Sequence, residues 1–181
     1  LPLDLPWEEG SYVLGEQLKG LLDKVAYLSP WGYVLHPPEE LQDFKNFLFL
    51  WKEIGLNNSS LLLENIEDRD LSGIWQEIED QGCGVCLDLG HLLVYEQEKI
   101  LEYSNLWEKV QLLHIYAPSG GHKHHSLAKL DKTGQKVLQR ILNNVKKNCT
   151  VLLEVFSPRA LQESLQALHT WCWQWGLYSK R

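Results

Sequence analysis

The sequence has 181 residues, of which 44% are hydrophobic and 23% charged, a composition typical of one globular domain with a hydrophobic core. A net charge of −7 argues against a nucleic-acid-binding surface, which needs a basic face. Four scattered cysteines and the lack of an apolar run of ~20 residues argue against a disulfide-stabilised secreted domain and a membrane protein, so we expect a cytoplasmic protein.

Short apolar runs alternate with helical stretches along the whole chain. We expect strands at residues 33–36, 61–66, 85–90, 110–116 and 151–156. We expect helices at residues 14–28, 39–54, 71–81, 94–104, 131–147 and 158–174. Apolar strands that alternate with helices predict a parallel sheet buried on both faces, so the expected fold class is α/β.

Two architectures fit this alternation, an open doubly wound sheet and a closed barrel. No glycine-rich phosphate-binding loop follows any expected strand, which argues against the dinucleotide-binding form of the open sheet. Each expected strand instead ends with a metal-binding or titratable residue, and these residues are His36, Glu64, Asp88, His114 and Glu154. Barrel enzymes carry their chemistry at the carboxyl ends of their strands. We therefore expect a (β/α)8 TIM-type barrel.

Further histidines extend this set of strand-end residues. In the motif Asp88-x-x-His91, Gly90 permits a tight bend, so both ligand-type side chains can face one site. The glycine- and histidine-rich loop after the fourth strand contains His122 and His124, which a spacing of two directs to the same side. Mixed histidine and carboxylate ligands suit Zn²⁺, Mn²⁺ or Fe²⁺ better than Ca²⁺ or Mg²⁺. We therefore expect one to three divalent metal ions.

The order of these motifs resembles the xylose isomerase-like barrel superfamily, which includes sugar isomerases and epimerases and the endonuclease IV (AP endonuclease family 2) branch. The resemblance covers the chain from about Leu1 to Phe156. It rests on His36, Glu64, Asp88-x-x-His91, His114, His122-x-His124 and Glu154.

This resemblance implies a barrel of eight strands, of which the five expected strands would be the fourth to the eighth. Residues 1–181 would then form a single barrel domain without its first three strands. The absence of methionine and the abrupt start of the sequence agree with this expectation. The first six residues would be the loop after the missing third strand.

The resemblance also implies two competing chemistries, of which the first is sugar isomerisation or epimerisation around one metal ion. The four ligands of such a site would be Glu64, Asp88, His114 and Glu154. Glu64 and Glu154 would exchange protons with a sugar carbon while the metal polarises the carbonyl group.

The second chemistry is phosphoester hydrolysis around up to three metal ions, as in the endonuclease IV branch. The additional ligands that this chemistry needs would be His36, His91, His122 and His124. Glu64 would bridge two metals, and Glu154 would hold a metal or activate the attacking water. These additional histidines favour hydrolysis over isomerisation.

Two departures from the endonuclease pattern argue against a DNA repair enzyme. His122 stands where that branch has aspartate, and Ala128 and Leu130 stand where it has glycines. Together with the acidic charge, these departures favour a smaller phosphodiester substrate. The opening of the chain and the segment 34–38 resemble the branch that hydrolyses the nucleotide loop of cobamides (corrinoid cofactors).

The resulting prediction is a metal-dependent hydrolase of a phosphodiester-containing small molecule, with a cobamide nucleotide loop as one candidate substrate. Its catalytic residues would be Glu154 and Glu64. A hydrolase of this kind predicts two or three bound metals. The alternatives are a metal-dependent sugar or sugar-phosphate isomerase, which predicts one metal, and a non-catalytic binding protein, which predicts none.

Overall fold

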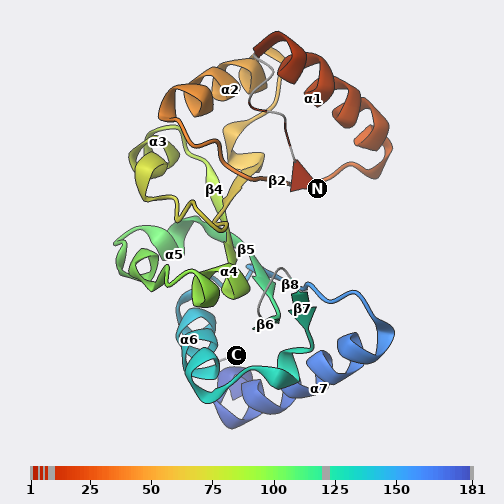
Figure 1. Cartoon of the computed structure of the whole chain (residues 1–181), viewed down its shortest axis with the longest axis vertical. Coiled ribbons are helices and arrows are strands. Elements are labelled where there is room, and N and C mark those ends of the chain that lie inside the picture. Colours follow the sequence, from red (N-terminus) through yellow and green to blue (C-terminus); the bar gives the residue numbers. More distant parts are fainter. Residues whose placement is uncertain (1, 4, 6, 8–10, 120–122, 180–181) are drawn as a thin grey trace. The chain divides into compact units, whose positions relative to one another are not determined.

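Contacts between Cα atoms divide the chain into two units, residues 1–86 and residues 87–181. The computed structural model describes residues 2–3, 5, 7, 11–119 and 123–179, which Figure 1 draws in colour. Strand β4 (Gly84–Asp88) runs across the boundary between the two units.

The described part of the first unit contains a parallel sheet and three α-helices. Strand β1 pairs with β2, β2 with β3, and β3 with β4, in each case in parallel. The strands other than β4 are β1 (Pro2–Leu3), β2 (Tyr33–Leu35) and β3 (Leu61–Glu64). The α-helices are α1 (Ser11–Val25), α2 (Leu41–Glu53) and α3 (Trp75–Asp80). Short 3₁₀ turns lie at Ala26–Leu28, Asn58–Ser60 and Ser72–Ile74.

Helix α2 supplies much of the core of the first unit. Its buried residues are Phe44, Phe47, Leu48 and Trp51, whose spacing of three and four places them on one helix face. The centroid of the Trp51 ring lies 5.2 Å from that of the Tyr33 ring and 5.6 Å from that of the Phe47 ring. Burial of such side chains stabilises the unit by about 2–3 kcal/mol each, because their apolar surface leaves water. Through Trp51 and Tyr33, this helix packs against β2.

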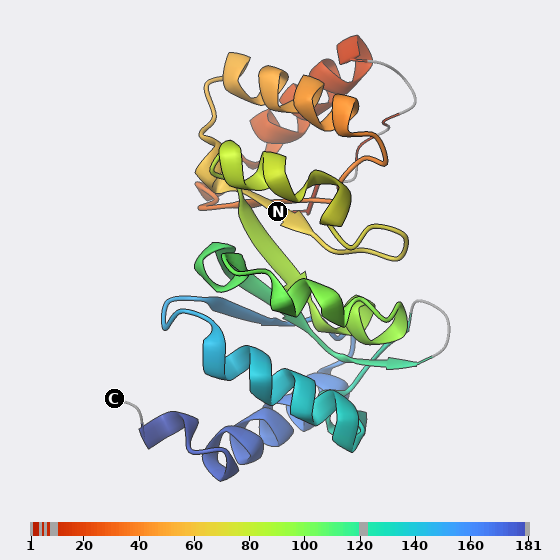
Figure 2. The same ribbon diagram turned by 90° about the vertical axis from the view of Figure 1, so that its left-hand side faces the viewer.

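In residues 87–119 and 123–179, the second unit contains a parallel strand pair, a hairpin and four α-helices. Strand β5 (Val110–Ile115) pairs in parallel with β8 (Thr150–Leu153), and β6 (Ala117–Ser119) pairs in antiparallel with β7 (Lys123–His125). The α-helices are α4 (Leu89–Val94), α5 (Leu106–Lys109), α6 (Lys132–Asn144) and α7 (Pro158–Gln174). Short 3₁₀ turns lie at Glu98–Glu102, Leu127–Lys129 and Leu177–Ser179. Helices α6 and α7 lie on the same side of the β5–β8 pair (Figure 2).

One buried hydroxyl group fastens the segment after β7 to helix α7. The Leu127 N–H donates to Ser164 Oγ at 2.8 Å, and the Ser164 hydroxyl donates to the Ala160 carbonyl at 2.7 Å. Ser164 has no exposed surface. A serine in the middle of a helix is explained by this contact, which holds the end of the hairpin against α7.

We expect the Ser164→Ala variant to lose about 1–3 kcal/mol of unfolding free energy, because the buried Leu127 N–H loses its acceptor. Urea denaturation measures this loss. Thr170 is the matched control, because its hydroxyl also donates to the carbonyl four residues earlier but lies on an exposed part of α7. Thr170→Ala should change the stability by less than about 0.5 kcal/mol. Equal effects of the two substitutions would contradict the anchoring role of Ser164.

The expected (β/α)8 barrel is wrong for this chain. Among the described residues, six strands pair in parallel, four of them in the first unit and β5 with β8 in the second. A closed barrel of this type needs eight parallel strands and about 250 residues, and the chain has 181. The α/β class itself is confirmed, and all five strands expected from the sequence are present as β2, β3, β4, β5 and β8.

Three segments also differ locally from the expectation. The helix expected at residues 94–104 is replaced by α4, which begins directly after β4, and by a later 3₁₀ turn. The polar loop after β5 contains the hairpin of β6 and β7. Residues 2–3 form strand β1 instead of a loop. None of the described helices has the length and apolar composition to cross a membrane.

Candidate metal centre

In the first unit, the structure brings His36 and Glu64 together. The parallel register pairs Leu35 of β2 with Leu63 of β3, so the residue after each lies at the same edge of the sheet. His36 Nε2 lies 3.4 Å from Glu64 Oε2. The Glu64 side chain is 4% exposed, whereas that of His36 is 37% exposed. The pair therefore combines a buried carboxylate with an imidazole that solvent reaches.

Arg69 holds the two loops that carry this pair. It lies in a turn after β3, where Ile66 and Arg69 form an antiparallel bridge. Its guanidinium donates to the Pro37 carbonyl, directly after His36, and lies 3.3 Å from Glu39 Oε1. Arginine suits this position because its several N–H donors can serve both partners at once. Arg69 is a positioning residue that the sequence analysis did not identify.

In the second unit, the candidate centre begins at Asp88, the last residue of β4 and the N-cap of α4. Asp88 Oδ1 accepts the backbone N–H of His91 at 2.7 Å, a capping bond that satisfies one free donor of the helix. His91 Nδ1 lies 3.7 Å from the same oxygen. Asp88 is fully buried and the His91 side chain is 20% exposed. The cap therefore brings the imidazole beside the carboxylate.

Strands β5 and β8 add His114 and Glu154 to the centre. The register pairs His114 with Leu152, and the Glu154 N–H donates to the Ile115 carbonyl at 3.2 Å, which continues the pairing past β8. His114 Nδ1 lies 3.6 Å from Glu154 Oε2 and 3.8 Å from Asp88 Oδ2. One ligand-type atom from each of these three side chains lies within 4.8 Å of the other two.

His124 reaches the centre from strand β7. Its Nδ1 lies 3.1 Å from the Glu154 carbonyl oxygen and 3.6 Å from Glu154 Oε2. A carbonyl oxygen only accepts hydrogen bonds, so Nδ1 carries the proton in this contact. The neutral ring then has its lone pair on Nε2. This tautomer is the one in which a metal-binding histidine uses Nε2 as ligand and donates Nδ1–H to a protein acceptor.

Tyr116 supports His124 and was not identified from the sequence. The two rings stack with centroids 3.8 Å apart and an angle of 13° between their planes. Phe156 stacks on His124 with a centroid distance of 5.2 Å. The sequence signal that points to Tyr116 is its place directly after β5, next to the histidine-rich hairpin. Ring stacking restricts the imidazole to one plane.

Gly90 has a different role from the expected one. It lies in the first turn of α4, where the backbone is helical, and not in a tight bend. A Cβ atom at this position would overlap with the Tyr116 ring. Tyr116 is 4% exposed, so its ring is enclosed by the surrounding residues. Glycine is therefore required here because the tyrosine lies against the helix backbone.

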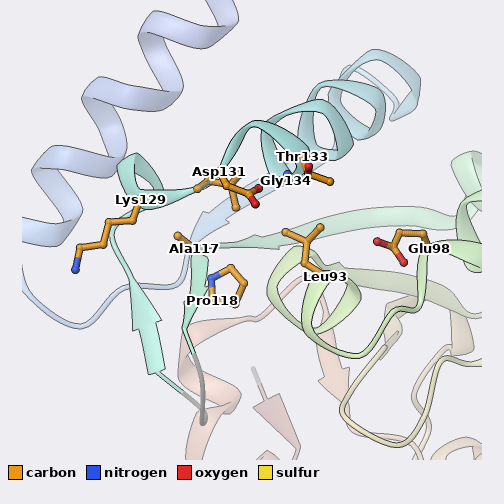
Figure 3. A pocket seen from close by; sticks show the side chains of 9 residues that line it. Leu93, Glu98, Ala117, Pro118, Lys129, Asp131, Thr133 and Gly134 are labelled. Carbon is orange, nitrogen blue, oxygen red and sulfur yellow. Dashed lines mark hydrogen bonds between the residues drawn. The ribbon is translucent and has the colours of Figure 1, made fainter.

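Two cavities of the second unit have a lining residue in common, and the smaller of them is lined in part by His91 and Tyr116. A cavity of about 30 Å³, enough for a water molecule, is lined by His91, Val94, Tyr95, Tyr116, Pro118, Ser119 and Lys123. A larger cavity of about 300 Å³ shares Pro118 with it, and Figure 3 shows its side chains. Leu93 and Pro118 face the N-terminal end of α6, where Asp131, Thr133 and Gly134 lie. This volume is at the lower end of small-molecule sites.

The second unit also has a cavity of about 450 Å³ that is lined in part by Cys149 and Cys172. Burial raises the pKa of the Cys149 thiol to about 11 and also raises the pKa of Cys172. Among the described residues, neither cysteine belongs to a group of side chains that could hold a metal ion. The cysteines of this cavity do not extend the candidate centre.

Within each unit, the structure brings predicted site residues together. The structure brings together Asp88, His91, His114, His124 and Glu154 in the second unit. It brings His36 to Glu64 in the first unit. His122 lies outside the described residues. The sequence matches no protein-family model and no curated protein.

Proposed function

We propose that the second unit binds a divalent transition metal through Asp88, His114 and Glu154, with His91 and His124 as further ligands. The distances between their side-chain atoms carry this proposal. The distances that join Asp88 to His91 and to His114, and His114 to Glu154, are 3.6–3.8 Å and are too long for hydrogen bonds. They are close to the ~3.4 Å that separates two ligands of a tetrahedral ion with bonds of about 2.1 Å.

The charges of the residues also fit a cation. Asp88 is fully buried and Glu154 is 25% exposed, and both approach His114. Two carboxylates in partly desolvated surroundings repel each other, so a positive charge between them is favourable. The donors are nitrogen and carboxylate oxygen, which suit Zn²⁺, Mn²⁺ or Fe²⁺.

We propose further that the centre hydrolyses a phosphodiester in a small molecule. A divalent metal ion bound here would supply Lewis-acid chemistry to a phosphoryl oxygen and to water. Glu154 would accept the proton of the attacking water, because it is the more exposed of the two carboxylates. The phosphorus–oxygen bond to the leaving alcohol breaks, and the alcohol takes a proton from solvent.

The number of donors favours hydrolysis over the alternative. Five side chains of one unit approach one another, and one tetrahedral ion takes four ligands. More than one ion would be typical of phosphoester hydrolysis. A sugar isomerase remains the second candidate, because Asp88, His114 and Glu154 are three of the four ligands that such a site needs. Metal binding by His36 and Glu64, and a catalytic role of Glu64, stay predictions.

The test measures the hydrolysis of bis(4-nitrophenyl) phosphate by the full chain loaded with Zn²⁺ or Mn²⁺. We expect turnover that falls at least about 100-fold in Glu154→Gln, because the amide is neither a base nor an anionic ligand. Glu163→Gln is the matched control, since Glu163 is a carboxylate of helix α7 that pairs with Arg159 outside the centre. This control should keep the wild-type rate.

Three outcomes separate the candidates. Turnover that depends on metal and on Glu154 supports the hydrolase. Interconversion of sugar phosphates with one bound ion, and no release of nitrophenol, would favour the isomerase. Equal rates in wild type and Glu154→Gln would contradict the proposed role of Glu154.

A further inference from the structure

An aromatic stack leads from the candidate centre to the surface of the second unit. Tyr116 is buried, the His124 side chain is 15% exposed, and Phe156 is 80% exposed. The centroid of the His124 ring lies 3.8 Å from that of Tyr116, with 13° between the ring planes. It lies 5.2 Å from the centroid of the Phe156 ring, with 28° between the planes. The stack therefore ends in an aromatic ring that is largely in contact with solvent.

The backbone on both sides of Phe156 is fixed. On one side, the Glu154 N–H donates to the Ile115 carbonyl at 3.2 Å. On the other side, Ser157 caps α7 and accepts the Ala160 N–H at 3.1 Å. Exposure of the apolar Phe156 ring to water is unfavourable, and a ligand that covers the ring would remove this cost. Phe156 stacks on His124, a candidate metal ligand. We therefore expect a part of the substrate to cover the Phe156 ring.

We propose that the exposed face of Phe156 binds a planar aromatic ring of the substrate, so that the substrate is a phosphoester with a nucleobase-like group. This inference rests on the proposed function, because Phe156 follows Glu154 by two residues and stacks on His124. The phosphoester would lie at the centre while the ring of the same molecule continues the stack. Parallel stacking accepts any flat ring, so it selects a class of substrate.

The test compares adenosine 5′-monophosphate with ribose 5-phosphate, which carries a hydroxyl group at the anomeric carbon where the nucleotide carries adenine. Titration calorimetry on the Zn²⁺-loaded full chain measures both dissociation constants. We expect the wild type to bind the nucleotide about tenfold or more tightly than the sugar phosphate. Phe156→Leu should remove this preference, and Phe156→Trp should keep it. Phe49→Leu is the matched control, since Phe49 is a 65% exposed phenylalanine of helix α2.

A second titration separates this inference from the proposed function. Adenosine without phosphate is titrated into the metal-free chain, where no metal contact contributes. Binding to the wild type that Phe156→Leu weakens would support the stacking role, even in a protein that hydrolyses no phosphodiester. Equal nucleotide affinity in wild type and Phe156→Leu would overturn the inference, and would leave metal binding and hydrolysis untouched.

Discussion

The Asp88→Asn variant is expected to fold with nearly wild-type stability and to bind metal at least about 100-fold more weakly. The reason is that Asp88 has two separable roles. As N-cap of α4 it accepts the His91 N–H at 2.7 Å, and an asparagine oxygen can accept the same bond. As a candidate ligand it supplies a negative charge beside His114, which the amide lacks. Urea denaturation and competition with a zinc-binding dye measure the two effects separately.

Asp131 provides the matched control for this prediction. It is the N-cap of α6, and its side chain accepts the Gly134 N–H, also at 2.7 Å. Alanine at either position should cost about 1 kcal/mol of stability through the lost cap. Asp131→Asn should leave the metal affinity unchanged. Unchanged affinity in Asp88→Asn would show that the buried carboxylate only caps the helix.

The Gly90→Ala variant is expected to lose about 1–3 kcal/mol of unfolding free energy, although alanine is the better helix former. The added methyl group would overlap with the Tyr116 ring, which is 4% exposed and lies among packed residues. Displacement of Tyr116 would disturb its stack on His124. We therefore also expect a metal affinity about tenfold lower, as is typical when a group that orients a ligand is lost.

Gly20→Ala is the control for the helix propensity of alanine. Gly20 lies within α1, and a Cβ atom there would meet nothing within 4 Å. This substitution should stabilise the protein by about 0.5–1 kcal/mol. Denaturation midpoints of both variants give the comparison. A Gly90→Ala protein as stable as Gly20→Ala would contradict the close contact between α4 and Tyr116.

The strands could be predicted because their apolar runs are nearly continuous and each is bounded by polar residues. The run Leu61–Leu63 is fully buried, as such a run in a parallel sheet should be. Helix α7 was predicted with its observed bounds, because Ser157 and Pro158 mark its start. The barrel prediction was wrong because alternation of strands and helices does not determine how many strands a sheet contains.

The candidate site was predictable where a ligand-type residue follows a strand directly. His36 and Glu154 follow their strands directly, Glu64 is the last residue of β3, and each has a partner of the predicted set. Tyr116 was missed although it follows β5 directly, because its role depends on the hairpin that brings His124 over its ring. The short strands of this hairpin contain proline, lysine and histidine, which a search for apolar runs does not detect.

The amount of metal bound by the purified full chain tests the central claim most directly. Wild type, Asp88→Asn and Asp131→Asn are loaded with Zn²⁺ or Mn²⁺, dialysed, and measured by elemental analysis. We expect at least one equivalent per chain in the wild type and in Asp131→Asn, and a clear loss in Asp88→Asn. A folded wild-type chain that retains no metal would contradict a metal centre in the second unit, and the proposed hydrolase with it.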